Sequence, residues 1–490
     1  MSSKNAPLGR AASPLLAITL LLGSATDGRS QEMPSDDACS VFSGARLLSM
    51  VGEAVDEPSP AQDVLVCGDR IRAVGPAGSL ELPEGAGRID LAGKVMMPGL
   101  VDGHVHLWGP LDLQLNLIWG VTTVRNLFGN PMTLALRENT ASGRMWGPRI
   151  VTAGPIVDGD PAVWPGSAAI TTAEEARTAV EQQVDAGYDF IKVYSRLEPE
   201  PFQAAITAAK EAGVPVGGHV PSSVSLQDAA VAGMDFIEHL TGFLPVLQKD
   251  DSAYARMTAE EKQAANRYRL IALQVEGFDA EKLPEVAEWM IENEVWNIPT
   301  FVVIERITAS LEQKQEWLES HPQMPTIPRM TRSFWDPSTD FRLQDVPAED
   351  LAARNRSAQL HLPIVKALHD AGAELMLGTD TPNPFVFPGY SVHEELQRFV
   401  DAGLTPWQAL RTATVQPARF FGEEDSMGRI APGYVADLLV LAENPLDDIA
   451  NSKSVAGVVS RGRWLDAQAL REMEDGVIEA SGNARPAANP

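Results

Sequence analysis

The stretch Gly99-Leu-Val-Asp-Gly-His104-Val-His106 has the apolar composition of a buried strand and ends in two histidines. Alternate residues of a strand point the same way, so His104 and His106 can place two imidazoles on one metal ion. By itself a His-x-His pair is common, and two histidines with ordinary structural hydrogen bonds explain it equally well. The remainder of the chain has to distinguish a metal site from this simpler alternative.

Beyond this stretch, short runs rich in Val, Ile and Thr alternate with Ala- and Glu-rich runs of helical composition as far as about Gly422. Such alternation is typical of repeated βα units around a parallel sheet. Eight strands with intervening helices predict an α/β fold, a (β/α)8 TIM barrel over residues 95–422, in which long connections after the sixth and seventh strands form lids or binding walls. The predicted strands are residues 95–106, 121–127, 149–157, 190–195, 214–220, 236–240, 295–303 and 374–381.

Metal-competent side chains recur at the carboxyl ends of these predicted strands. Four of the eight histidines of the chain stand there, namely His104, His106, His219 and His239, and the eighth strand ends in Gly378-Thr-Asp380-Thr. Barrel enzymes place their catalytic groups at this end of the barrel. A metal centre is therefore predicted at the barrel mouth. The histidines interpreted as structural are His321, His361 and His369.

The two ends of the chain differ in sequence pattern from the predicted barrel. Residues 38–94 and 423–470 consist of short alternating runs separated by Gly and Pro turns, and each piece is too small to bury its own core. They are predicted to build one small β-sandwich domain together. Cys39 and Cys67, the only cysteines, either form a disulfide or remain two buried thiols. The polar, Pro-containing tail of residues 480–490 is predicted to be disordered.

Residues 1–25 have the layout of a secretory signal peptide: the basic residues Lys4 and Arg10, an apolar run from Pro14 to Leu22, and then small residues. The apolar run is shorter than the roughly 20 residues that cross a bilayer. Export to the periplasm or the medium is predicted, with no membrane attachment after cleavage. The 66 acidic and 39 basic side chains give a net charge of −27, which excludes a phosphate backbone as the expected partner.

Several further motifs accompany the histidines, and with them the sequence resembles the amidohydrolase superfamily over nearly its whole mature length. The resemblance is to the branch that holds imidazolonepropionase-like and prolidase-like proteins. One departure is Asn126 after Arg125, where relatives often carry Asp, so the partner of Arg125 is left open. The matching motifs are Asp189-Phe-Ile-Lys192-Val-Tyr194, Gly217-Gly-His219-Val, Ile237-Glu-His239-Leu, Gly378-Thr-Asp380-Thr and Gly433-Tyr-Val-Ala-Asp437-Leu.

The resemblance implies a centre of two divalent metal ions, for which the ligand types suggest zinc. His104 and His106 are expected to bind the more buried ion together with Asp380, and His219 and His239 to bind the second. Lys192, N-carboxylated by carbon dioxide, would bridge the two ions, because a carbamate has oxygens where an ammonium has no lone pair. If Lys192 instead forms an ordinary salt bridge, a single-metal site follows.

Other residues receive roles from their positions. Asp380 is the predicted catalytic residue, which takes a proton from the attacking water and passes it to the leaving group. Tyr194 faces the same way as Lys192 and either donates to a developing oxyanion or fills space. His393 follows the eighth strand and is a candidate substrate-binding residue. Arg125 is expected to be structural.

The predicted function is an exported metal-dependent hydrolase that uses a metal-activated hydroxide on an amide-type C–N bond of a small molecule, a dipeptide or an N-acyl amino acid. The alternative keeps the metal centre and changes the bond to a lactone, cyclic amide, carbamate or phosphoester. A non-catalytic binding protein on the same fold is the least favoured hypothesis, since every expected ligand and Asp380 are present. The oligomeric state is left open, a homo-oligomer included.

Overall fold

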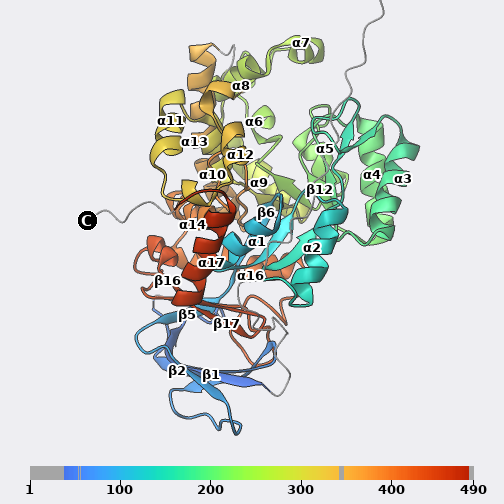
Figure 1. The fold of residues 1–490 in the computed structure, drawn as a ribbon. Helices are drawn as coiled ribbons and strands as arrows, with labels where there is room; N and C mark the ends of the chain where they lie inside the picture. Colours follow the sequence, from blue (N-terminus) through green and yellow to red (C-terminus); the bar gives the residue numbers. More distant parts are fainter. Residues whose placement is uncertain (1–37, 53, 56, 341–346, 485–490) are drawn as a thin grey trace, which may run out of the picture. The chain divides into compact units, whose positions relative to one another are not determined.

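The computed structural model describes residues 38–52, 54–55, 57–340 and 347–484 (Figure 1). The predicted signal peptide of residues 1–25 lies outside the described residues. No helix within those described ranges is both long and apolar enough to cross a bilayer.

Short parallel strands build the central part of the fold. One sheet holds three strands in the order β6-β7-β8, and a second holds six in the order β10-β9-β11-β12-β13-β14. Their bounds are β6 Leu100–Val105, β7 Val121–Asn126, β8 Arg149–Thr152, β9 Val157–Gly159, β10 Ala168–Ile170, β11 Ile191–Val193, β12 Val216–Gly218, β13 Phe236–Glu238 and β14 Trp296–Ile298.

Isolated parallel bridges connect these two sheets to each other and to residues 374–381. Ala153 bridges to Phe190, Asn297 to Leu375, and Val105 to Thr381. Hydrogen bonds therefore run from β6 through β14 and residues 374–381 back to β6, a TIM-barrel-like α/β arrangement. The eighth predicted strand is present only as bridges, because Asp380 has a φ of +64° and interrupts the extended backbone.

Most of the predicted strands are shorter than expected, and three of them are divided or continue into a helix. Residues 95–106 form two strands in different sheets, β5 (Val95–Pro98) and β6, since Pro98 has no N–H and ends β5. At the break, a Cβ on Gly99 would lie 2.2 Å from Oγ1 of Thr122, so only glycine fits. Residues 149–157 likewise divide into β8 and β9. Residues 295–303 end as a strand at Ile298, and a helix begins at Phe301.

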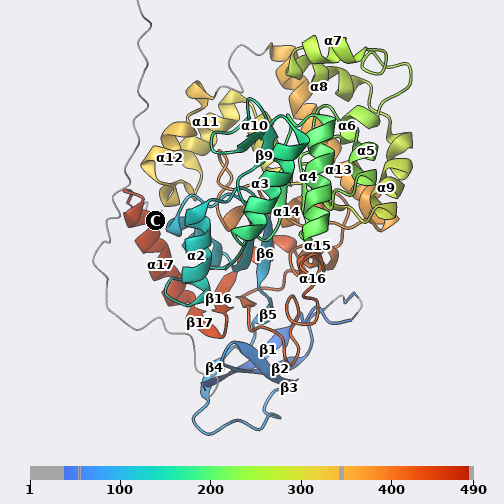
Figure 2. The ribbon, with the colours of Figure 1, turned by 90° about the vertical axis from the view of Figure 1, so that its right-hand side faces the viewer.

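Helices follow most of the barrel strands, and α3 and α4 lie side by side (Figure 2). Local sequence signals begin and end them: Thr172 and Glu175 form a capping box at the start of α3, and Gly213 ends α4 in the left-handed conformation. The bounds are α1 Pro110–Ile118, α2 Pro131–Ala141, α3 Ala173–Asp185, α4 Pro199–Ala212, α5 Leu226–Val231, α9 Leu283–Glu292, α13 Ala348–Ala371, α14 Tyr390–Asp401, α15 Pro406–Thr412 and α16 Val415–Phe420.

The long connections after β13 and β14 contain helices of their own, as their length predicted. Within the second connection, Trp335 is buried against Phe385 and Phe387, whereas its neighbour Phe334 is exposed. The inserted helices are α6 Phe243–Val246, α7 Ala259–Ala264, α8 Arg267–Glu276, α10 Phe301–Thr308, α11 Leu311–Ser320 and α12 Arg329–Phe334, with the short turn η2 Met324–Thr326.

Both ends of the chain contribute to one peripheral sheet of eight strands, in the order β17-β16-β15-β5-β1-β2-β3 with β4 beside β1 (Figure 1). The shared origin of this region agrees with the prediction, but the structure has one continuous sheet instead of two facing sheets. The reason is that β5 and β15 pair directly, which joins the two ends edge to edge. The bounds are β1 Cys39–Leu47, β2 Ala61–Cys67, β3 Arg70–Pro76, β4 Gly87–Asp90, β15 Leu438–Leu441, β16 Val455–Ser460 and β17 Arg463–Asp466.

The last described residues are ordered by contacts, contrary to the predicted disorder from residue 480. Helix α17 spans Ala467–Ala480. Two residues beyond its end, Ser481 and Asn483, make hydrogen bonds through their side chains. Ser481 Oγ donates to the carbonyl of Thr326, and Asn483 Nδ2 donates to the carbonyl of Pro325. Backbone acceptors of η2 thus hold this end of the chain, and residues 485–490 lie outside the described residues.

Cys39 and Cys67 form a disulfide, which resolves the two alternatives that the sequence left open. The two residues are directly paired in the β1–β2 register. They close a loop with a sequence separation of 28.

Removal of this disulfide is expected to lower the free energy of unfolding by about 3 kcal/mol, because the crosslink restricts the unfolded chain. Denaturant unfolding with and without a reductant measures the change. The double variant Cys39→Ser/Cys67→Ser is the control and should unfold like the reduced protein under both conditions. An unchanged midpoint in the reductant would contradict the expectation.

Candidate functional site

The predicted ligands meet at the carboxyl ends of their strands. The imidazole centroids of His104 and His106 are 5.3 Å apart, those of His104 and His239 are 4.8 Å apart, and those of His219 and His239 are 4.9 Å apart. The four rings therefore form one continuous cluster, although they come from β6 and from the residues that follow β6, β12 and β13.

Asp380, near the end of the segment of residues 374–381, extends its side chain into this cluster. Its Oδ1 lies 2.9 Å from Nε2 of His106 and 3.2 Å from Nε2 of His104, and its Oδ2 lies 3.8 Å from Nε2 of His239. One ligand atom each from His104, His239 and Asp380 lie within 4.8 Å of one another, which is compatible with a shared metal ion. The aspartate is thus central to the histidine cluster.

The cluster holds buried polar atoms that nothing in the described part of the chain satisfies. Nε2 of His104 and Nε2 of His219 have no hydrogen-bond partner there, and Oδ1 of Asp380 has only its contacts with Nε2 of His104 and of His106. An unsatisfied buried polar group costs about 1–3 kcal/mol, so two such imidazole nitrogens in one cluster favour a bound ligand. Imidazole nitrogens with a carboxylate oxygen are a donor set that suits zinc and similar divalent ions. The residues therefore fit a metal centre.

Glu238 and Arg125 hold the ring of His104. Nδ1 of His104 lies 2.6 Å from Oε2 of Glu238, and a carboxylate only accepts, so the proton is on Nδ1 and Nε2 presents its lone pair. Arg125 Nη1 donates to the other oxygen of Glu238 at 2.8 Å and to the carbonyl of Gly103 at 2.9 Å. The three side chains form a buried chain that sets the tautomer of a predicted metal ligand.

Aromatic rings pack against the guanidinium of Arg125 in addition to its ion pair with Glu238. The guanidinium carbon lies 4.5 Å from the ring centroid of Phe190, 4.0 Å from that of Phe236 and 4.9 Å from that of Phe420. These cation–π contacts compensate the desolvation of a fully buried charge. Arg125 is therefore structural, as predicted, and its partner, which the sequence left open, is Glu238.

Thr300 sets the tautomer of His239 by a similar argument. Its hydroxyl donates to the carbonyl of Pro299 at 2.8 Å, so its oxygen accepts from Nδ1 of His239 at 2.7 Å. Nε2 of His239 is then left to bind metal. Burial lowers the pKa of His239 to about 3, which keeps this ring neutral.

Around His219, Ser195 Oγ lies 2.9 Å from Nδ1, and the ring of Tyr194 stacks on the imidazole with centroids 3.9 Å apart. Burial is the main reason that the pKa of His219 is well below its ordinary value. Tyr194 thus contacts a predicted ligand directly, and its hydroxyl accepts from Trp164 Nε1 at 2.9 Å.

Lys192 is 1% exposed and lies beside the cluster. Burial lowers the pKa of its amine to about 8, against the opposing effect of Glu238 and Asp380. Its side chain requires a glycine on the next strand: Gly218 has a φ of +136°, and a Cβ there would lie 2.8 Å from Cδ of Lys192. Gly218 of the sequence motif therefore makes room for the lysine, whereas Gly217 makes room for Phe236.

Strained backbone is concentrated in this region. Positive φ occurs at His239 (58°), Leu240 (49°), Thr300 (47°) and Asp380 (64°), none of which is glycine. Such conformations cost about 1–3 kcal/mol each and persist where the surroundings demand them. In this region the strained residues direct side chains from the ends of several strands toward one point.

Comparison with known proteins adds a decisive observation: the sequence profile of the amidohydrolase family matches residues 95–465. The chain belongs to the amidohydrolase family. This membership confirms the superfamily that the motifs predicted.

Individual relatives of this amidohydrolase match shorter regions. Ochratoxinase of Aspergillus niger is 36% identical over 103 residues, which cover 21% of this chain and 20% of that protein. Adenine deaminase of Chelativorans sp. (strain BNC1) is 30% identical over 222 residues, which cover 42% of this chain and 35% of that protein. The amidohydrolase therefore spans a fifth to a third of the length of these curated relatives.

Solved structures resemble it over most of its length. A bottromycin amidohydrolase has a TM-score of 0.72 and 27% sequence identity, with 91% of each chain covered. A Xaa-Pro dipeptidase with bound methionine has a TM-score of 0.64 and 19% identity, with 88% of this chain and 100% of that chain covered. At that identity the second likeness shows the shared fold alone.

His393 is placed differently from its prediction. It is 1% exposed on α14, with Nδ1 2.9 Å from Oγ of Ser452 and Nε2 3.0 Å from the carbonyl of Trp119. Both ring nitrogens are used inside the protein, so the predicted substrate contact is not retained and His393 is structural.

Some residues of the site were missed by sequence reasoning. Glu238 and Asp102 carry a signal that was available, because each is an acidic residue inside a buried apolar strand. Asp102 accepts from the backbone N–H and the hydroxyl of Thr379, which ties β6 to the segment that carries Asp380. Thr300 carries no such signal, since its role depends on a strained backbone and on a distant histidine.

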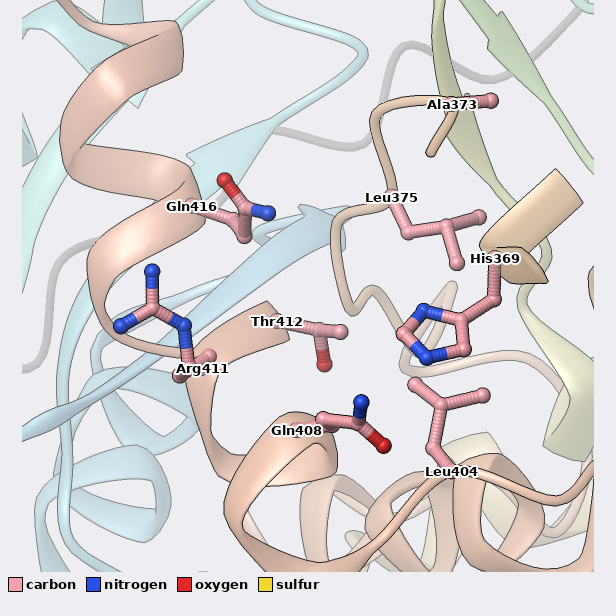
Figure 3. A pocket seen from close by; sticks show the side chains of 8 residues that line it. All are labelled: His369, Ala373, Leu375, Leu404, Gln408, Arg411, Thr412 and Gln416. Atoms are coloured by element: carbon pink, nitrogen blue, oxygen red, sulfur yellow. The ribbon is translucent and has the colours of Figure 1, made fainter. Parts of the chain in front are cut away.

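A separate small cavity lies at the opposite end of the segment that carries Asp380. It has a volume of about 70 Å³, and the ring of His369 faces Thr412 and Gln408 across it (Figure 3). It includes none of the predicted ligands. Its lining residues are His369, Ala373, Leu375, Leu404, Gln408, Arg411, Thr412 and Gln416.

Glu238→Gln is expected to weaken divalent-metal binding about 10- to 100-fold, because the neutral amide accepts poorly from His104 and leaves Arg125 unpaired. Competition titration against a chelator measures the affinity. Glu374→Gln, which changes a more exposed carboxylate paired with Arg419, is the control and should keep the wild-type affinity. Equal affinities in both variants would contradict the assigned role of Glu238.

Thr300→Val and Thr300→Ser form a matched pair for His239. The valine removes the oxygen that accepts from Nδ1, so metal affinity should fall about ten-fold or more, whereas serine keeps the oxygen and should bind nearly as wild type. The same chelator titration compares them. If serine fails as valine does, the methyl group and not the hydrogen bond positions His239.

Proposed function

We propose that this amidohydrolase is a metal-dependent hydrolase of amide-type C–N bonds in small molecules. The observation that carries the proposal is the buried cluster of four imidazoles, Lys192 and Asp380, with imidazole nitrogen atoms that lack partners among the described residues. A structural cluster of this size would be expected to satisfy its own polar atoms.

Within this proposal the cluster binds two divalent ions, which we take to be zinc on grounds of ligand chemistry. His104, His106 and Asp380 would hold one ion, and His219 and His239 the other. When bound, such ions lower the pKa of water from 15.7 toward about 7 and polarise a carbonyl under attack. Glu238 and Thr300 keep two of the rings in the tautomer that binding requires.

Lys192 is proposed to bridge the two ions as a carbamate. Its neutral amine would attack carbon dioxide, so that an N–C bond forms while one C–O π bond opens onto oxygen, and the nitrogen would lose a proton to solvent, which leaves an anionic group with two oxygens. The lowered pKa of Lys192, about 8, supports this step, because only the unprotonated amine is nucleophilic. Burial beside the histidines also disfavours the charged ammonium form of the uncarboxylated lysine.

Asp380 is proposed as the proton shuttle. Water supplies the oxygen that bonds to the carbonyl carbon, Asp380 takes its proton, and the same proton passes to the amide nitrogen as the C–N bond breaks. Tyr194 is proposed to support the oxyanion, because its ring stacks on the predicted ligand His219 and its hydroxyl is held beside the cluster by Trp164.

The proposed substrates are dipeptides or N-acyl amino acids. Support comes from the names of structural relatives, an amidohydrolase and a dipeptidase. One relative is named an adenine deaminase, so a test of the substrate should also include the release of an amino group from a purine.

Export to the periplasm or the medium is also proposed. The layout of residues 1–25 supports it, and so does the disulfide between Cys39 and Cys67, since disulfides persist in oxidising compartments.

Asp380→Asn is expected to lower kcat by about 10²- to 10⁴-fold at nearly constant side-chain volume, because the amide cannot take the proton. The measurement uses mature protein loaded with zinc in bicarbonate and a panel of dipeptides, N-acyl amino acids, lactones and adenine. Asp401→Asn, on the exposed end of α14, is the control. Hydrolysis of lactones alone, or full activity of Asp380→Asn, would overturn the proposal.

A further inference from the structure

The loop of residues 160–166, between the paired strands β9 and β10, lies next to the metal-ligand cluster. At one position, Trp164 Nε1 donates to the hydroxyl of Tyr194, whose ring stacks on His219. At the other, the ring of Phe128 lies against Gly166 and also contacts the ring of His106, with centroids 6.5 Å apart. The loop therefore reaches both of the histidine pairs that the proposed function assigns to metal.

Hydrogen bonds to a buried carboxylate and from an arginine hold this loop in place. Asp158 is fully buried, and its carboxylate accepts from the backbone N–H groups of Val163 and Arg196, both at 2.8 Å. Arg196 Nη1 in turn donates to the carbonyl of Pro161 at 2.6 Å. The parallel pairing of β9 with β10 closes the base of the loop. Its side chains are thus presented by a fixed backbone.

Those side chains expose apolar surface. Trp164 is 44% exposed and Val163 is 38% exposed, although Trp is a residue that folding normally buries. The only polar atom of the indole is already used by Tyr194, so what remains to meet a ligand is its flat apolar face. A fixed, half-exposed indole beside a reaction centre is the kind of group that binds rings.

We propose that Trp164, with Val163, forms a subsite that binds an aromatic or other flat apolar group of the substrate, next to the bond that is cleaved. This inference deepens the proposed amide hydrolysis and rests on it for the identity of the bond. Burial of a ring on the indole is expected to raise kcat/KM roughly 10- to 100-fold over a substrate without a ring. The enzyme is then selective for amides that carry a ring on either side of the C–N bond.

The test compares three substrates. N-acetyl-alanine has no ring, N-acetyl-phenylalanine has a ring on the amine side of the C–N bond, and N-phenylacetyl-alanine has a ring on the acyl side. Wild type should hydrolyse one ring-bearing compound with at least about ten-fold higher kcat/KM than N-acetyl-alanine. Trp164→Ala should lose that preference, on top of any equal loss for all three compounds that comes from the missing hydrogen bond to Tyr194. Phe334→Ala removes a 69% exposed aromatic residue of α12 and should leave the preference unchanged.

Trp164→Phe separates the ring from the hydrogen bond to Tyr194. It keeps an aromatic face and removes the donor, so it should retain the preference even if kcat falls for all three compounds. An equal loss of kcat/KM on all three substrates in Trp164→Ala, or a preference lost as fully in Trp164→Phe as in Trp164→Ala, overturns the subsite, because Trp164 would then act only through Tyr194.

A binding measurement distinguishes failure of the subsite from failure of the proposed reaction. If wild type hydrolyses none of the three amides, the proposed C–N hydrolysis fails for this class, and calorimetric titration of the zinc-loaded protein with phenylacetate and acetate decides the subsite. Tighter binding of phenylacetate that disappears in Trp164→Ala supports the subsite. Equal binding of the two acids by wild type overturns it.

Discussion

The structure depends on buried polar atoms that have to be held with their lone pairs facing one point. Glu238 and Thr300 accept hydrogen bonds from Nδ1–H of His104 and His239, so that Nε2 of each ring is left for metal. Arg125 balances the charge of Glu238, and aromatic rings cover the guanidinium. Removing one partner of such a network leaves an uncompensated charge in the interior, which is strongly destabilising.

Backbone geometry follows from the same requirement. Strands of a barrel end side by side, but their last side chains converge only if the chain turns sharply. Positive φ at His239, Thr300 and Asp380, and glycine at Gly218 beside Lys192, are the local consequences. The eighth barrel segment is a set of bridges instead of a regular strand for this reason, since Asp380 is directed into the cluster.

The regions outside the barrel serve the site in different ways. The peripheral sheet joins both ends of the chain through the pairing of β5 with β15, which brings Asp437 beside Gly99 at the start of β6. The loop of residues 160–166 instead stands at the carboxyl ends, where Asp158 and Arg196 fix it. One region secures the base of the barrel and the other shapes its mouth.

The sequence by itself predicted the type of fold, the family and the residues that meet in the cluster, because strand periodicity and metal-competent residues at strand ends are local patterns. Contacts between distant residues decided the rest. Glu238 reaches Arg125 and Thr300 reaches His239 only after the strands are assembled, and His393 is removed from the site by Ser452 and Trp119. Likewise, Pro98 and Gly99 divide one predicted strand between two sheets because of partners far along the chain. Local composition predicts which side chains carry chemistry, whereas their orientation depends on neighbours that the tertiary structure supplies.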